Sequence, residues 1–132
     1  MITTIGFDEI ISYVEKNYSI RLQLKQIDEQ TLEVSYKPGL FIPTIAVKIR
    51  IEAVRKDIVC LSYESSTSMS LIFAGLVSHL DQKLPNGVVI NTENKRIDIY
   101  LEQIKQLEKV LQVLHPSSIM IQEDAISLVL SI

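Results

Sequence analysis

The feature that most constrains this chain is an uncharged stretch from Ser65 to Leu80, SSTSMSLIFAGLVSHL, in a sequence of which 22% is charged. Its large apolar side chains recur at spacings of three and four residues, which puts them on one face of an α-helix. An apolar face of this size must be buried away from water. We therefore expect a central helix whose core-facing residues are Met69, Ile72, Phe73, Leu76, Val77 and Leu80.

The opposite face of this predicted helix also lacks the Lys and Glu side chains of a surface helix. Its side chains are small or apolar, and small side chains allow a second backbone to approach closely. We expect this face to contact another helix or another subunit through Leu71, Ala74, Gly75 and Ser78.

Much of the remaining chain alternates apolar and polar residues with a period of two, the pattern of strands with one solvated face. The clearest example runs from Ile45 to Glu52, where every second residue is Ile or Val. Short turns separate neighbouring segments, which favours antiparallel hairpins. The predicted strands cover residues 20–25, 32–36, 45–52, 58–63, 88–91, 96–101, 119–122 and 126–132.

Two further helices are expected, one from Phe7 to Asn17 and one from Glu102 to the residue before Pro116. Together these elements predict an α+β fold: a single domain over residues 1–132, with mostly antiparallel sheets of about eight strands packed on the central helix. The halves before and after Ser65 have similar lengths and element orders. A duplicated unit is therefore an alternative, although no repeat of individual residues supports it.

The net charge, the number of cysteines and the length of the uncharged stretch argue against several classes of function. A net charge of −3 argues against nucleic-acid binding, which depends on clustered Lys and Arg. A single cysteine cannot form an internal disulfide, and the first residues lack a signal-peptide pattern, so we expect a cytoplasmic protein. The uncharged stretch is shorter than the roughly 20 residues that span a bilayer, so no transmembrane segment is expected.

Residues that commonly carry chemistry are few and scattered. His79 and His115 are predicted at helix ends, where the helix dipole favours a cationic side chain. Cys60 falls in a strand predicted to be buried, where a thiol behaves as a small apolar group. Strand alternation and the helix dipole account for Asp98 and Glu102. The sequence contains no recognised metal, nucleotide or nucleophile motif, so we expect no catalytic residue, metal site or cofactor.

One loop departs from the usual polarity of turns. Leu40, Phe41 and Ile42 stand between Pro38 and Pro43, where solvated turns are normally polar. The loop either folds back to cap the core or presents its apolar tip to a partner. We name its three apolar residues as a candidate anchor, for a protein partner rather than a membrane surface, because the chain is acidic.

These observations favour a non-enzymatic protein–protein interaction or assembly module, acting as a homo-oligomer or with another protein. The reason is that 47% of the residues are hydrophobic while the reactive side chains do not converge. The alternative is a carrier of a small apolar ligand or lipid, since a curved sheet over a helix can enclose an aliphatic cavity. An enzyme with an unrecognised site is the third hypothesis.

Overall fold

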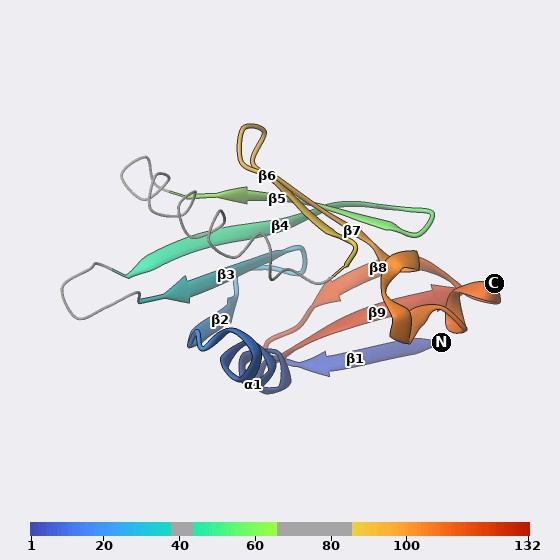
Figure 1. The fold of residues 1–132 in the computed structure, drawn as a ribbon, viewed down its shortest axis with the longest axis horizontal. Coiled ribbons are helices and arrows are strands. Elements are labelled where there is room, and N and C mark those ends of the chain that lie inside the picture. Colours follow the sequence, from blue (N-terminus) through green and yellow to red (C-terminus); the bar gives the residue numbers. More distant parts are fainter. Residues whose placement is uncertain (38–43, 66–85) are drawn as a thin grey trace.

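The computed structural model describes residues 1–37, 44–65 and 86–132. These residues form nine strands in two antiparallel sheets, one α-helix and three short 3-10 helices, so the α+β class is confirmed (Figure 1). The strands are β1 (Ile2–Gly6), β2 (Leu22–Gln26), β3 (Thr31–Tyr36), β4 (Ile45–Arg55), β5 (Ile58–Glu64), β6 (Val88–Asn91), β7 (Arg96–Tyr100), β8 (His115–Ile121) and β9 (Ala125–Ser131). The helices are α1 (Phe7–Tyr18), η2 (Leu101–Gln103), η3 (Lys105–Leu107) and η4 (Val110–Gln112).

The predicted central helix lies outside the described residues except for Ser65, and its packing stays a prediction. Within the three described ranges, no helix combines the length and apolar character needed to cross a membrane.

The larger sheet has the strand order β2-β3-β4-β5-β7-β6, and one of its faces is apolar. The period-two alternation of the sequence produces this inner face, because the register sets apolar residues of neighbouring strands side by side. The strand predicted at residues 45–52 is confirmed as β4 and continues to Arg55. A buried cluster on the inner face consists of Ile45, Val47, Tyr63 and Ile97, each no more than 9% exposed.

The outer face of the larger sheet is polar. Charges of opposite sign alternate across it, because one row of the register contains Lys25, Glu33, Lys48 and Glu64. Opposite charges on neighbouring strands attract one another, and they favour a face that is in contact with water.

The smaller sheet has the order β1-β9-β8 and packs on the inner face of the larger sheet. Ile121 of β8 and Ile126 of β9 belong to one core cluster with Leu32 of β3. The turn between β2 and β3 also binds β8: Ile121 N donates to Glu29 O, and Gln26 Nε2 donates to Ile121 O, both at 2.9 Å. These bonds join the two sheets along one side.

The helix predicted at residues 7–17 is confirmed as α1. Phe7, the first residue of α1, is buried against Leu32 and Ile121, so the start of the helix helps to close the space between the sheets. The helix ends at Ser19, whose left-handed backbone (φ 57°) allows its N–H to donate to Glu15 O at 3.0 Å.

The α-helix predicted from Glu102 to Pro116 is wrong, because this segment forms η2, η3 and η4. Its inward side chains Leu101, Ile104 and Leu107 recur every three residues, which is the repeat of a 3-10 helix. Ile104 is also extended (φ −86°, ψ 111°) and interrupts any longer helix. Pro116 lies within β8, next to a register shift on an edge strand, where a proline is tolerated.

This segment contributes to stability through its buried side chains. Leu111 is 9% exposed and packs in a cluster with Val59 and Leu101. Leu111→Ala should therefore lower the free energy of unfolding by about 2–3 kcal/mol in urea denaturation. Val113 is 66% exposed, and Val113→Ala should change it by less than about 0.5 kcal/mol. Equal effects of the two substitutions would contradict the burial of this segment.

The turn between β2 and β3 predicts a pH dependence of stability. The Gln30 backbone N–H donates to Asp28 Oδ1 at 2.8 Å, and this bond is the main reason that the pKa of Asp28 lies below its ordinary value of 3.8. Because the folded pKa is lowered, the carboxylate stabilises the fold above its unfolded pKa, and this contribution is lost as the pH falls through the folded pKa.

Asp28→Asn should therefore lower the thermal midpoint at neutral pH, and the difference from the unsubstituted protein should shrink as the pH falls below the ordinary pKa of 3.8. Glu29→Gln changes the neighbouring exposed carboxylate of the same turn and serves as the control. A midpoint difference for Asp28→Asn that is constant with pH would contradict the ionic role of Asp28.

Candidate functional site

The residues predicted to form an interaction surface are not among those that the structure describes. They are Leu40, Phe41 and Ile42 of the loop after β3, and Leu71, Ala74, Gly75 and Ser78 of the predicted central helix. They stay predictions. Within the described residues, the candidates are the reactive side chains, two surface pockets and one free sheet edge.

The reactive side chains of the described residues include one contact, between His115 and Asp57. His115 begins β8 instead of ending a helix, and its Nδ1 lies 3.2 Å from Asp57 Oδ1 in an exposed pair. Cys60 is half-buried on the polar outer face of β5, not enclosed in the core as predicted. No three His, Cys, Asp or Glu residues gather at a metal-binding distance in the part of the chain described. His115, Asp57 and Cys60 therefore do not form the hydrogen-bonded nucleophile and general base that nucleophilic catalysis requires.

Two open pockets have charges of both signs on their walls. The larger, of about 560 Å³, lies between α1 and the paired ends of β2 and β3. Glu15 and Arg21 line it and pair with each other at 3.3 Å. The smaller, of about 300 Å³, lies on the outer face beside Glu33, Lys48 and Glu64. Mixed charges give neither pocket the single-sign field that attracts a charged ligand.

Strand β1 provides the free edge. Among the described residues it pairs with β9 alone, so its other edge has no strand beside it. Leu130 N donates to Met1 O at 2.7 Å and Phe7 N donates to Asp124 O at 2.8 Å, which fixes the alternation of the bonds between the two strands. Odd-numbered residues of β1 therefore bond to β9, and the backbone groups of Ile2 and Thr4 and the N–H of Gly6 point away from it. The Gly6 carbonyl belongs to the N-cap of α1 and accepts the first bond of that helix.

The side chains of this edge are exposed and uncharged. Ile2 is 67% exposed and Ile5 is 43% exposed, and Thr3 and Thr4 are exposed as well. Thr4 Oγ1 lies 3.0 Å from Ser127 Oγ, a hydrogen bond that holds β1 to the next strand. The whole of β1 and β9 contains no charged residue.

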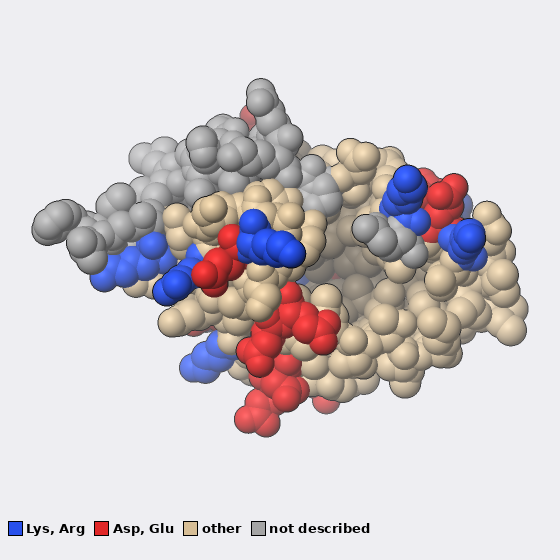
Figure 2. All heavy atoms as spheres, turned by 60° about the horizontal axis from the view of Figure 1, so that its bottom comes forward, with Lys and Arg blue, Asp and Glu red and all other residues tan. Residues whose placement is uncertain are grey.

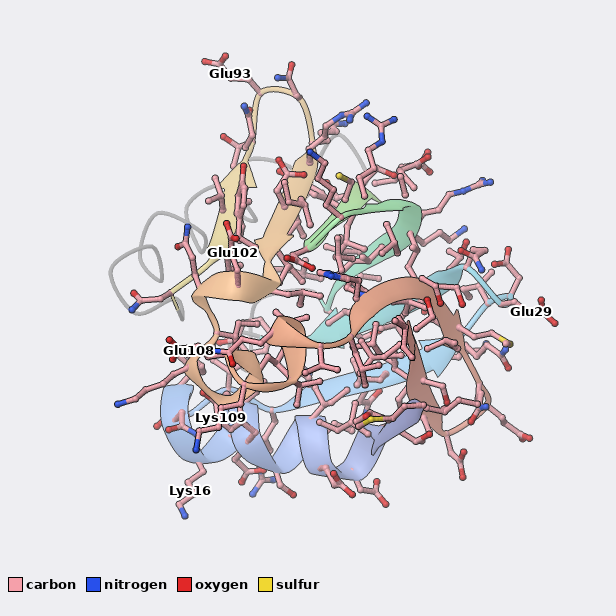
Figure 3. The ribbon with its side chains drawn as sticks, turned by 90° about the vertical axis from the view of Figure 1, so that its right-hand side faces the viewer. Lys16, Glu29, Glu93, Glu102, Glu108 and Lys109 are labelled. Atoms are coloured by element: carbon pink, nitrogen blue, oxygen red, sulfur yellow. The ribbon has the colours of Figure 1, made fainter. Side chains whose placement is uncertain are left out.

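The distribution of charge agrees with this picture. Figure 2 shows a broad uncharged area over the lower right-hand part of the molecule, with charged groups to its left and a further charged cluster above it at the upper right. The charged side chains labelled in Figure 3 project outward from α1, from turns and from the 3-10 segment: Lys16, Glu29, Glu93, Glu102, Glu108 and Lys109.

Each of the other sheet edges carries a feature that discourages pairing. Strand β2 carries Lys25 and is contacted by α1. Strand β8 is bonded to the β2–β3 turn through Ile121. Strand β6 has only four residues. Strand β1 also contacts α1, which follows it directly in the chain, but it carries no charge and no register shift in the described structure. It is therefore the edge best suited to bind another strand.

Strand β1 was not predicted from the sequence, in which the first expected element begins at Phe7. The signal was present in composition rather than in period: Ile2, Thr3, Thr4 and Ile5 are four consecutive β-branched residues, which favour strands. Strict alternation is absent, because an edge strand of a small sheet is exposed on both faces.

A comparison with protein-family models, with curated proteins and with solved structures finds no match to this chain. The fold and the free edge define an α+β protein with an exposed, uncharged edge strand.

Proposed function

We propose that this protein is a non-enzymatic protein–protein interaction module that binds its partner by strand addition to β1. The observation that carries the proposal is a row of outward backbone groups, on a strand without charge, that have no strand partner among the described residues: the N–H and C=O of Ile2 and Thr4 and the N–H of Gly6. An added strand gains main-chain hydrogen bonds along such an edge. We place the module in the cytoplasm, following the sequence prediction.

The carrier hypothesis has less support from the geometry. A carrier of an apolar molecule needs an enclosed apolar cavity. The larger pocket formed by the described residues is open, and the Glu15–Arg21 pair lies in its wall. Enzymatic function is also less well supported, because His115, Asp57 and Cys60 do not assemble into a reactive group.

Site-specific photo-cross-linking in cells tests the proposal. A photoreactive amino acid at position 2 should cross-link to one partner protein, because Ile2 is at the free edge and 67% exposed. The matched control is position 27, where Ile27 is 43% exposed on the β2–β3 turn. Thr4→Pro in the same chain should abolish the product. Cross-linking no stronger at position 2 than at position 27 would contradict the proposal.

A further inference from the structure

We infer that β1 pairs antiparallel with β1 of a second copy of this chain, around a two-fold axis at Thr4. This inference rests on the proposed function, because it names the partner of the same edge. The pairing joins two smaller sheets into one sheet of order β8-β9-β1-β1-β9-β8. It leaves neither copy with a free β1 edge, so the assembly stops at a dimer.

The outward backbone groups set the register. In an antiparallel pair, each residue whose groups point to the partner exchanges both hydrogen bonds with one opposite residue. An axis at Thr4 pairs Thr4 with Thr4 and sets Ile2 opposite Gly6. The Gly6 N–H can then donate to Ile2 O of the second copy, while the Gly6 carbonyl accepts the first bond of α1. An axis at Thr3 pairs only Ile2 with Thr4 and leaves the Gly6 N–H without a strand partner.

The side chains fit this register. Ile5, which is 43% exposed, comes to lie opposite Thr3 of the second copy, in a non-hydrogen-bonded pair where side chains approach most closely. Ile2 comes to lie opposite Gly6, which has no side chain to obstruct it. Pairing therefore covers part of Ile5 with a side chain of the second copy and leaves room for Ile2.

The distribution of charged residues around β1 favours antiparallel over parallel pairing of two copies. A two-fold axis brings identical segments together, so a charged residue near Thr4 would meet its own copy, and β1 has none. Acidic residues lie beyond the Gly6 end: Asp8 and Glu9 in the first turn of α1, and Asp124, whose carbonyl accepts from Phe7 N. Antiparallel pairing separates the two Gly6 residues by about 14 Å along the strands, beyond the Debye length of about 8 Å, whereas parallel pairing would place the acidic ends together.

Self-pairing also gives both copies of β1 a hydrogen-bonded neighbour on their free sides. A peptide of another protein bound to β1 would itself form the new edge of the sheet, with its outer backbone groups unpaired. Two copies of β1 instead satisfy each other. The edge is short, so the dimer should be weak and in equilibrium with the monomer.

Sedimentation analysis over a concentration series tests the inference. The chain of 15.0 kDa should approach twice that mass as its concentration rises. Thr4→Pro removes an outward N–H and should weaken association by about tenfold or more, since no bond to β9 uses that group. Thr4→Ala is the matched control: it loses the Ser127 contact but keeps the N–H, and should dimerise like the unsubstituted chain.

A second variant guards against misfolding of Thr4→Pro. Ile2→Lys places a charge on the exposed edge, where it should weaken the dimer without affecting the core, and circular dichroism should confirm that both variants stay folded.

Disulfide trapping tests the register, in a Cys60→Ala background that removes the native thiol. A cysteine at position 4 faces its own copy at about 5.5 Å between Cα atoms, within disulfide range, so Thr4→Cys should give a covalent dimer under oxidation. Thr3 is also exposed, but in this register its copy lies beyond about 7 Å, so Thr3→Cys should remain mostly monomeric.

The outcomes separate this inference from the proposed function. A monomer at all concentrations, or a dimer that Thr4→Pro leaves intact, would overturn self-pairing. If position 2 then cross-linked to a different protein, the interaction function would stand with another partner. Failure of every cross-link at position 2 would overturn both. Efficient trapping by Thr3→Cys instead of Thr4→Cys would overturn the Thr4-centred register.

Discussion

Ile121→Ala should lower the free energy of unfolding by about 3–4 kcal/mol, one of the two largest effects expected from a single substitution in this protein. Ile121 is 3% exposed and packs with Phe7 and Leu32, so the substitution leaves a cavity where α1 and both sheets meet. Urea denaturation at low protein concentration measures the loss without a contribution from self-association.

Met120→Ala is the matched control for this substitution. Met120 precedes Ile121 in β8, points to the other face of the smaller sheet and is 40% exposed. Its loss should reduce the free energy of unfolding by less than about 1 kcal/mol. If Met120→Ala were as damaging as Ile121→Ala, the assignment of the two faces of β8 would be wrong.

Gly87→Ala is expected to have a comparable effect, about 3 kcal/mol, through the backbone rather than the core. Gly87 has φ +95°, where residues with a Cβ are strained, and an added Cβ would lie 2.6 Å from Tyr100 O. Tyr100 N donates to Gly87 O at 2.7 Å, so the hairpin of β6 and β7 cannot open there without losing a bond. Thermal unfolding followed by circular dichroism would show a lowered midpoint.

Gly6→Ala separates this effect from a general cost of replacing glycine. Gly6 has φ −74°, and the nearest atoms to an added Cβ are 3.9 Å away. The free energy of unfolding should therefore change by less than about 1 kcal/mol, and removal of backbone freedom in the unfolded chain could even raise it. A large loss for Gly6→Ala together with a small one for Gly87→Ala would contradict the described backbone.

The strands of the larger sheet could be predicted because burial on one face forces a period of two. In β4, Ile45 and Val47 face the core while Ala46 and Lys48 face water, and the sequence records that difference at each step. β1 could not be found in this way. Its side chains are exposed on both faces, so no alternation marks the strand.

The helix error has a different physical origin. Apolar residues at Leu101, Ile104, Leu107 and Leu111 fit both an α-helix and a series of 3-10 turns, since both put residues three apart on nearly the same side. The choice is made by packing against Val59, a contact distant in sequence. The burial of these four apolar side chains was predictable from the sequence, but the hydrogen-bonding pattern of the backbone that carries them was not.

The candidate site was hidden for the same reason. Whether a strand lies inside a sheet or at its edge depends on which distant segments pair with it, and the sequence of β1 alone does not contain that information. The absence of charge in Ile2–Gly6 could be read directly. Its meaning depends on the pairing with β9 on one side and on the open side opposite.

The pairing of β1 with β9 also determines when the chain can fold during its synthesis. Ile2 lies opposite Val129, so the first strand leaves the ribosome long before its partner exists. Hairpins such as β2–β3 and β4–β5 connect residues close in sequence and can form while translation continues. Throughout that interval β1 is a β-branched segment without a partner in its own chain. Nascent copies on neighbouring ribosomes present this same unpaired strand to one another.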